Sequence, residues 1–225
     1  MKLAVLFSGG KDSAYALYKA RQEHDVVCLI SIISENKDSY MFHTPNIDLT
    51  QLQAQSLGLP LIKKVTKGIK EEELEDLKAA IMQAKEEYSV KGIVSGAFAS
   101  AYQRDRIEKI CNELNLECIS PLWGKNPEKL MREMLKKGFK FLISSIAADG
   151  LDETWLGRVI TDQDIDKLVE LNKKIGIHIA FEGGEAETLM IQGPIFKKKI
   201  IIKKAEKIME DKNTGMYRIT KAELE

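Results

Sequence analysis

In the first half of the chain, short apolar runs alternate with segments in which apolar residues recur every three or four positions. The short runs predict strands, over residues 3–7, 26–33, 61–65, 92–95 and 116–119, and the run at 26–33 is rich in β-branched residues. The segments between them predict helices, over residues 13–22, 52–57, 71–88 and 101–114. Repeated alternation of strand and helix is typical of α/β proteins, so we predict a parallel sheet with helices on both faces.

Beyond residue 123 this alternation stops. Periodicity predicts two helices and one strand, over residues 127–137, 162–174 and 139–147. Several short β-like runs come next, with a hairpin turn expected at 213–215. We therefore predict a larger domain over residues 1–123 and a smaller C-terminal α+β domain over residues 124–225.

Three segments rich in small or polar residues follow predicted strands directly. They are a glycine-rich loop at 8–13, Ser34 at the end of the second strand, and Gly96 after the fourth. Ligands of open parallel sheets lie beyond the carboxyl ends of the strands. We therefore expect these segments to converge on one crevice.

The glycine-rich loop reads Ser8-Gly9-Gly10-Lys11-Asp12-Ser13 and matches neither of the two common phosphate motifs. The dinucleotide fingerprint needs a third glycine, which the loop lacks. A Walker loop needs glycine where this chain has Val5, and Ser or Thr where it has Asp12. The hexapeptide indicates instead a shorter loop directly between the first strand and its helix.

Each residue type in this loop suits a phosphate group. Gly9 and Gly10 can adopt positive φ angles and bring backbone N–H groups close to phosphate oxygens. The start of the helix adds a partial positive charge, Lys11 adds a full one, and two serine hydroxyls are further donors. The alternative is a tight turn in which Asp12 or Ser13 only caps the helix.

Composition and charge narrow the class of protein. The 225 residues carry no net charge, which gives no reason to expect strong non-specific binding to nucleic acid. An odd number of cysteines without a CxxC pair fits a disulfide framework poorly, so we expect buried thiols in a reducing cytoplasm. No apolar run approaches the roughly 18–20 residues of a membrane span. The three histidines lack metal-ligand spacing, and His178 is expected in a strand.

The hexapeptide resembles the signature of the PP-loop ATP pyrophosphatases, whose fold is a Rossmann-like sheet of the HUP type. Further motifs resemble the diphthine–ammonia ligase family, over residues 42–46, 96–106, 121–123, 150–158 and 182–188. The resemblance runs from the first strand to about residue 196. Phe181 stands where the family often has glycine, and Ala186 where it often has an aromatic residue. These departures concern substrate detail rather than ATP use.

The resemblance implies an enzyme that amidates diphthine, a modified histidine of elongation factor 2, to diphthamide. The diphthine carboxylate attacks the α-phosphate of ATP, which gives an acyl-adenylate and pyrophosphate, and ammonia then displaces AMP. ATP and Mg²⁺ are the implied cofactors, with Lys11 stabilising the departing pyrophosphate and Asp12 orienting the loop or the metal. Elongation factor 2 and ammonia are the implied partners, and a homodimer is compatible with them.

Other residues of the matched motifs are assigned to the site. Glu182, Glu185 and Glu187 surround a glycine pair and are expected to bind ammonium, the cationic amine of the substrate or Mg²⁺. The alternative is a solvated turn with ordinary surface acids. The remaining residues assigned to the nucleotide are Ser34, His43, Gly96 and Arg104.

Two other functions stay open at this point. Another PP-loop enzyme, such as a tRNA-modifying ligase or thiolase, often carries paired cysteines or an RNA-binding domain, and the sequence shows neither. A nucleotide-binding sensor would keep the same sheet without catalysis. From residue 192 onward basic residues outnumber acidic ones. This excess predicts solvated lysines beside a strand, or a docking face for a protein substrate that includes Lys198 and Lys203.

Overall fold

The computed structural model describes residues 1–36, 46–69 and 71–225. By their contacts these residues divide into two compact units, each with its own sheet. The first unit holds Met1–Ser8 and Asp12–Trp123. The second holds Gly124–Glu225 together with the loop segment Gly9–Lys11.

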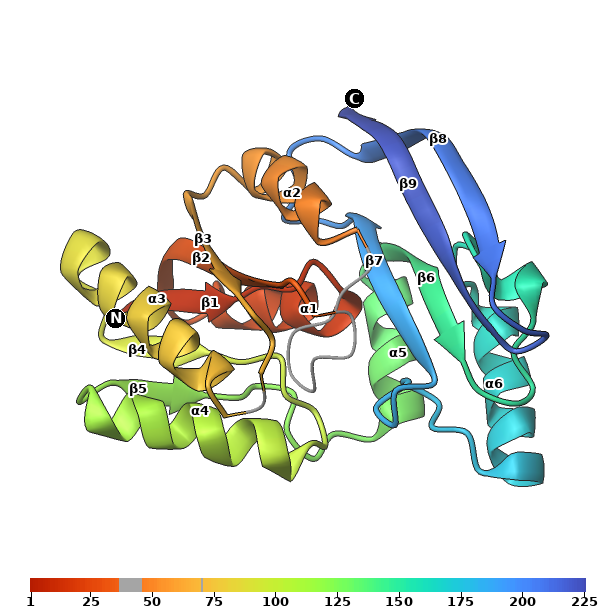
Figure 1. The fold of residues 1–225 in the computed structure, drawn as a ribbon, viewed down its shortest axis with the longest axis horizontal. Helices are drawn as coiled ribbons and strands as arrows, with labels where there is room; N and C mark the ends of the chain where they lie inside the picture. Colours follow the sequence, from red (N-terminus) through yellow and green to blue (C-terminus); the bar gives the residue numbers. More distant parts are fainter. Residues whose placement is uncertain (37–45, 70) are drawn as a thin grey trace. The chain divides into compact units, whose positions relative to one another are not determined.

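The first unit is built on a five-stranded sheet in which every neighbouring pair of strands is parallel. In chain order the strands are β1 (Lys2–Leu6), β2 (Asp25–Ser34), β3 (Leu61–Thr66), β4 (Gly92–Val94) and β5 (Glu117–Ile119). In space they lie in the order β3-β2-β1-β4-β5 (Figure 1). The strand order therefore reverses beside β1, and such reversal points are where open α/β sheets bind ligands. The predicted parallel sheet is confirmed.

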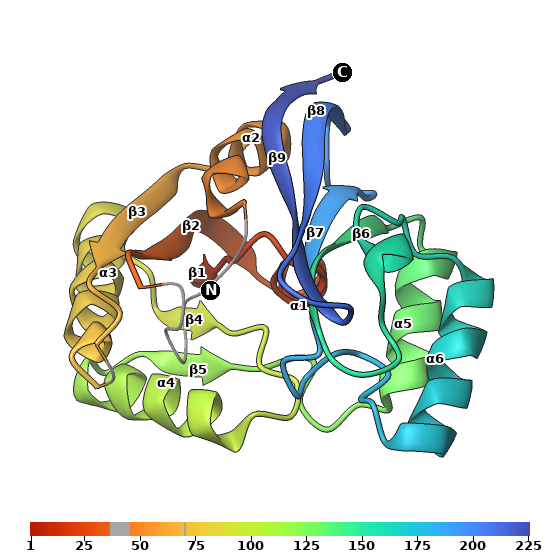
Figure 2. The same cartoon turned by 45° about the vertical axis from the view of Figure 1, so that its right-hand side comes forward.

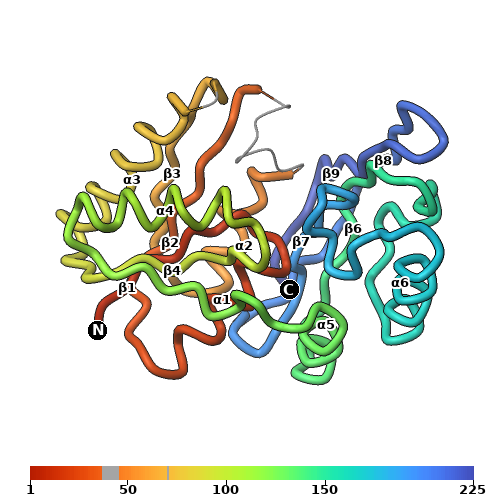
Figure 3. The backbone as a smooth tube through the Cα atoms, turned by 90° about the horizontal axis from the view of Figure 1, so that it is seen from below, coloured from red at the N-terminus to blue at the C-terminus, as the bar shows by residue number. Residues whose placement is uncertain are grey.

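Helices cover both faces of this sheet. They are α1 (Lys11–Ala20), α2 (Thr50–Leu57), α3 (Glu73–Tyr88) and α4 (Ala101–Glu113), with a short 3₁₀ turn at Ile47–Leu49. Helices α3 and α4 lie on one face and α1 on the other (Figure 3). Leu77 and Ile81 of α3 share one buried cluster with Ile30 of β2, Ile93 of β4 and Ile110 of α4. Because both faces of the sheet are covered, the central strands β1 and β2 read as nearly continuous apolar runs.

The second unit combines an antiparallel sheet with two α-helices. Its elements are α5 (Pro127–Lys136), β6 (Lys140–Ala147), a 3₁₀ turn (Glu153–Trp155), α6 (Asp162–Ile175), β7 (Ala186–Gln192), β8 (Ile200–Met209) and β9 (Thr214–Leu224). The strands lie in the order β7-β6-β9-β8, all neighbours antiparallel. Figure 2 shows α5 and α6 side by side. This is the α+β arrangement predicted for the C-terminal part.

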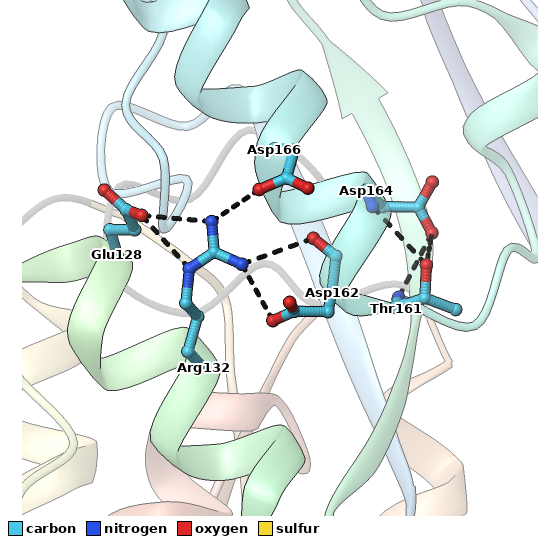
Figure 4. A network of polar contacts seen from close by, with 6 residues as sticks. All are labelled: Glu128, Arg132, Thr161, Asp162, Asp164 and Asp166. Atoms are coloured by element: carbon cyan, nitrogen blue, oxygen red, sulfur yellow. Dashed lines mark hydrogen bonds and ion pairs between the residues drawn. The ribbon is translucent and has the colours of Figure 1, made fainter.

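One arginine joins the two helices of the second unit. Arg132 on α5 pairs with Glu128 one turn earlier on the same helix, at 3.0 Å. It also reaches Asp162 at 2.8 Å and Asp166 at 2.6 Å in the first turns of α6 (Figure 4). These three carboxylates raise the pKa of the guanidinium above its already high value. Asp162 lies in the first turn of α6, where the macrodipole favours an acid, so the arginine and the dipole both stabilise this aspartate.

The C-terminal segment is a long hairpin rather than a series of short strands. Its turn lies at residues 210–213, where the Asp211 carboxylate accepts the amides of Asn213 and Thr214. Across the hairpin, Lys199 pairs with Glu225 at 2.8 Å and Lys203 with Glu223 at 2.7 Å. The positive charge predicted for this tail is therefore partly neutralised by cross-strand acids, which weakens the docking interpretation at Lys203.

The three cysteines are free thiols. Cys28 and Cys111 are buried and unbridged, and Cys118 is half-buried. Burial raises the pKa of the Cys28 thiol to about 12, so this thiol stays protonated and unreactive at neutral pH. Within the described ranges, no helix combines the length and the apolar character needed to cross a membrane.

Candidate functional site

The glycine-rich loop joins the central strand directly to a helix. Strand β1 ends at Leu6 and helix α1 begins at Lys11, two residues earlier than the periodicity indicated. Gly9 has a φ angle of 82°, a conformation that glycine adopts without strain. Lys11 and Asp12 therefore lie in the first turn of α1, where backbone N–H groups have no helical acceptor. The loop places these donors and the positive end of the helix dipole at the carboxyl end of β1.

Gly96 lies against the start of this helix. A Cβ atom at residue 96 would come within 2.9 Å of the backbone nitrogen of Ser13 and 3.1 Å of the carbonyl carbon of Asp12. The loop after β4 can approach α1 this closely because residue 96 has no side chain. On the other side of the turn, the hydroxyls of Ser8 and Ser13 are 3.2 Å apart and hydrogen-bonded.

Ser34 occupies the end of β2, which is the neighbour of β1. Its hydroxyl donates to the carbonyl of Asn36 at 2.9 Å and accepts the Asn36 amide at 3.1 Å. Because β2, β1 and β4 are parallel neighbours, Ser34, the glycine-rich loop and Gly96 share one edge of the sheet. His43 lies outside the described residues.

Arg104 is held by two acids on α4 and by Trp123. The Ser100 hydroxyl caps this helix by accepting the Gln103 amide. The Arg104 guanidinium stacks 4.0 Å from the centre of the Trp123 ring. It also lies 3.4 Å from carboxylate oxygens of both Asp105 and Glu108. The side chain remains about one-third exposed, so contact with an anion would compete with these partners.

One of the three acids in the cluster, Glu185, stabilises the turn in which it lies. The Glu185 carboxylate accepts the backbone amide of His178 through one oxygen and that of Gly183 through the other, each at 2.8 Å. Glu185 therefore closes the turn that precedes β7. Glu182 and Glu187 are half-buried in the turn and in β7.

The expectation of a strand at His178 is wrong. This residue lies in the turn between α6 and β7. Its Nδ1 atom accepts the amides of Ala180 and Glu182, at 3.2 and 3.3 Å. Since Nδ1 is an acceptor, we assign the ring proton of the neutral histidine to Nε2. Short apolar runs flank the residue in the sequence, and periodicity alone cannot separate such a turn from a strand.

Residues of the same turn and of β7 contact the loop segment Gly9–Lys11, which groups with the second unit. The Lys11 amide donates to the Thr188 hydroxyl at 3.0 Å, and the Met190 amide donates to the Gly9 carbonyl at 2.9 Å. The Lys11 ammonium lies 5.9 Å from the centre of the Phe181 ring. The Lys11 side chain is only 2% exposed, so the lysine is held in a protected position.

From the sequence, Phe181 is only a departure from the family pattern, and Thr188 is only part of a matched motif. Phe181 has a φ angle of 64°, which is unusual for a residue with a side chain. Its ring is buried, which explains how the fold tolerates this backbone conformation. The pattern of polar and apolar residues in β7 does not predict the hydrogen bond between Thr188 and the Lys11 amide.

The loop fits the polyphosphate of a nucleotide better than it fits an isolated metal ion. Glycine backbone, helix N-terminus and a protected lysine together form an anion site. Among the residues that the structure describes, no group of three or more His, Cys, Asp or Glu side chains could hold a metal ion. Mg²⁺ commonly binds through one or two carboxylates and the phosphates of its substrate, so this finding is compatible with a metal that arrives with a nucleotide.

The fold and the glycine-rich loop together define a class of protein. The chain is an α/β protein that can hold a phosphate group at the junction of its central strand and first helix. The family model described as diphthamide synthase N-terminal domain matches residues 1–118, and the C-terminal domain model matches residues 126–224. The chain therefore belongs to the diphthamide synthase family.

Curated relatives of the chain carry the name diphthine–ammonia ligase. The protein of Homo sapiens is 37% identical, and the match covers 93% of this chain and 85% of the human protein. The protein of Mus musculus is 36% identical with the same coverage. The protein of Danio rerio is 34% identical, and the match covers 100% of this chain and 97% of the fish protein.

Proposed function

We propose that this chain is a diphthine–ammonia ligase, which converts diphthine on elongation factor 2 to diphthamide with ATP and ammonia. The observation that carries the proposal is the phosphate loop at the start of α1, in a chain that both diphthamide synthase domain models match. Amidation of a carboxylate needs activation because the carboxylate oxygen is a poor leaving group. A site that binds the polyphosphate of ATP supplies that activation.

The reaction takes place in two steps, adenylation of the carboxylate and amidation of the adenylate. A carboxylate oxygen of diphthine attacks the α-phosphorus, and the bond between the α-phosphorus and the bridging oxygen breaks to release pyrophosphate. Ammonia then attacks the acyl carbon of the adenylate, AMP leaves, and one proton is lost as the amide forms. Both steps depend mainly on positioning and on charge neutralisation.

The residues of the loop have separate roles in the first step. The Lys11 ammonium and the amides that follow Lys11 in the first turn of α1 stabilise the charge that develops on the departing pyrophosphate. The Lys11 amide itself donates to Thr188. Asp12, in the same turn, would orient the loop or hold Mg²⁺. Mg²⁺ would supply further neutralisation of the phosphate oxygens.

The acids near β7 are assigned to ammonium or to the cationic amine of diphthine. Glu185 is occupied by two backbone amides, so its role is to shape the turn. Glu182 and Glu187 are then the candidates to hold ammonium or the cationic amine of diphthine. Asn or Gln variants at these two positions are expected to raise the KM for ammonium or for the protein substrate and to leave ATP binding unchanged.

The test of the proposal is Lys11→Ala, assayed with diphthine-bearing elongation factor 2, MgATP and ammonium. Mass spectrometry follows the diphthamide product, and chromatography separates AMP from ADP. We expect AMP and diphthamide with the wild type, and a loss of about 100-fold or more in rate with Lys11→Ala, as for other removed oxyanion donors.

Lys19→Ala is the matched control, because Lys19 lies in the last turn of the same helix, where its ammonium packs over the Tyr15 ring. This control is expected to keep the wild-type rate. Pyrophosphate release at the wild-type rate by Lys11→Ala would refute the role of Lys11. ADP formation, or ATP binding with no turnover, would refute the ligase assignment itself.

A further inference from the structure

Strand β7 is an edge strand whose outer side is partly covered by the phosphate loop. It pairs with β6 on one side and stands at the end of the order β7-β6-β9-β8. An edge strand presents backbone N–H and C=O groups that need partners. One of them, the Met190 amide, donates to the Gly9 carbonyl at 2.9 Å. The loop therefore takes a place that a further strand would fill.

Two residues earlier on the same strand, a side chain makes a second contact with the loop. The Thr188 hydroxyl accepts the Lys11 amide at 3.0 Å, and Thr188 is only 5% exposed. The carbonyl of Gly9 and the amide of Lys11 belong to the two peptide groups that flank Gly10. Strand β7 thus holds both peptide groups that flank Gly10.

The hydrogen bond from the Lys11 amide to Thr188 fixes the position of the Lys11 backbone. Lys11 is the first residue of α1, and its amide is one of the N–H groups that the helix itself leaves without an acceptor. A buried amide without a partner is costly, so the hydroxyl of Thr188 favours one position of the Lys11 backbone. The Lys11 side chain is almost fully buried, so a shift of its Cα atom would displace the ammonium as well.

We propose that Thr188 is a positioning residue for ATP cleavage, which holds the Lys11 backbone so that the ammonium meets the departing pyrophosphate. This inference rests on the proposed function. It assigns to β7 a direct part in holding the loop segment Gly9–Lys11, which belongs to the same unit. Thr188 acts through Lys11 and does not itself contact the reacting atoms.

The test compares Thr188→Val with Thr188→Ser. Valine keeps the shape and the β-branch of threonine but removes the acceptor, whereas serine keeps the acceptor. We expect kcat for AMP formation to fall by about tenfold to 100-fold in Thr188→Val, as is typical when a catalytic group is displaced by up to 1 Å. Thr188→Ser is expected to remain within about threefold of the wild type. A smaller change is expected in the KM for the protein substrate, because Thr188 acts on the phosphate end of the reaction.

Controls separate positioning from general stability and from failure of the proposed function. Thr220→Val makes the same replacement on β9, where the hydroxyl donates to the Lys204 carbonyl, and it should leave kcat unchanged. The dissociation constant for MgATP, measured by calorimetry on the full chain, needs no protein substrate and is expected to rise in Thr188→Val only. It therefore reports on the loop even if elongation factor 2 is not the substrate.

The outcomes are decisive in each case. Wild-type kcat and ATP affinity in a folded Thr188→Val would overturn the inference, as would an equal loss in Thr188→Ser. If the valine variant does not fold, Thr188→Ala replaces it. Wild-type kcat and ATP affinity in Thr188→Ala would also overturn the inference. Absence of AMP formation by the wild type would count against the proposed function, whereas the calorimetric comparison would still test Thr188.

Discussion

Replacing Gly96 by alanine should disturb the start of α1 without adding any polar group. The new Cβ atom would lie 2.9 Å from the backbone nitrogen of Ser13 and 3.1 Å from the Cα atom of the same residue. Ordinary van der Waals contact begins at 3.4 Å, so the nitrogen must withdraw by about 0.5 Å, which is 3.4 minus 2.9. The atoms in the way belong to the backbone, which cannot move aside as the end of a flexible side chain can.

This displacement is large enough to affect ATP cleavage. Catalytic groups need to be held within about 0.5 Å of their productive geometry, and a misplacement of 1 Å can cost about 100-fold in rate. We therefore expect kcat/KM for AMP formation to fall by about tenfold, which corresponds to about 1.4 kcal/mol of transition-state stabilisation. Overpacking should also reduce the free energy of unfolding by about 1–3 kcal/mol.

Gly92→Ala is the matched control, because it causes a similar clash at the other end of β4. Its Cβ atom would meet the Glu117 carbonyl oxygen and a Leu3 methyl carbon, both at 2.9 Å. Urea unfolding should show losses of the same order in both variants, whereas ATP affinity and AMP formation should decline in Gly96→Ala alone. Equal loss of activity in both variants, or wild-type kinetics in Gly96→Ala, would refute the reasoning.

Two further predictions concern the stability of the second unit. Phe181 has a φ angle of 64°, which costs a residue with a Cβ atom about 1–2 kcal/mol. The free energy of unfolding, measured with urea, should therefore be about 1 kcal/mol higher for Phe181→Gly than for Phe181→Ala. The opposite order would show that the residue is not strained. Burial raises the pKa of the Asp164 carboxyl, but hydrogen bonds from Thr161 and the charge of Arg158 outweigh burial and lower it. The stability gained from this lowered pKa is present above the unfolded value of about 4 and is lost as the pH falls through the folded value. Asp164→Asn should therefore destabilise the protein by about 1 kcal/mol at pH 7 through the weakened helix cap, and a gap to the wild type that does not narrow below about pH 4, measured by urea unfolding, would contradict this account.

Sequence periodicity was sufficient for the order of elements in the first unit because it reports which side of a segment is buried. The alternation of strands and helices predicted the five-stranded parallel sheet, and two helix starts of the second unit are specified by local residues. Pro127 begins α5, and the Asn126 side chain before it accepts the Lys129 amide. Thr161 and Asp164 form a reciprocal cap at the start of α6. Such caps involve residues three apart, so the chain alone specifies them.

The turn before β7 was beyond the reach of periodicity. His178 reads as part of a strand, but its ring accepts two amides of the turn. The Glu185 carboxylate accepts two further amides of the same segment. A side chain that replaces backbone partners leaves no periodic signal, since the hydrogen bonds depend on the path of the turn rather than on the order of apolar residues.

What the sequence by itself determined is the parallel sheet, the position of the glycine-rich loop at the end of its first strand, and the chemistry that such a loop can perform. Only the tertiary structure decided which groups hold that loop in place. Thr188 and Lys11 are 177 residues apart, and their hydrogen bond exists because β7 is an edge strand with a side chain and an amide directed at the loop. Local patterns specify which residues are buried and where helices begin. A contact between residues far apart in the chain depends on strand order and register, and one apolar pattern is compatible with more than one order and register.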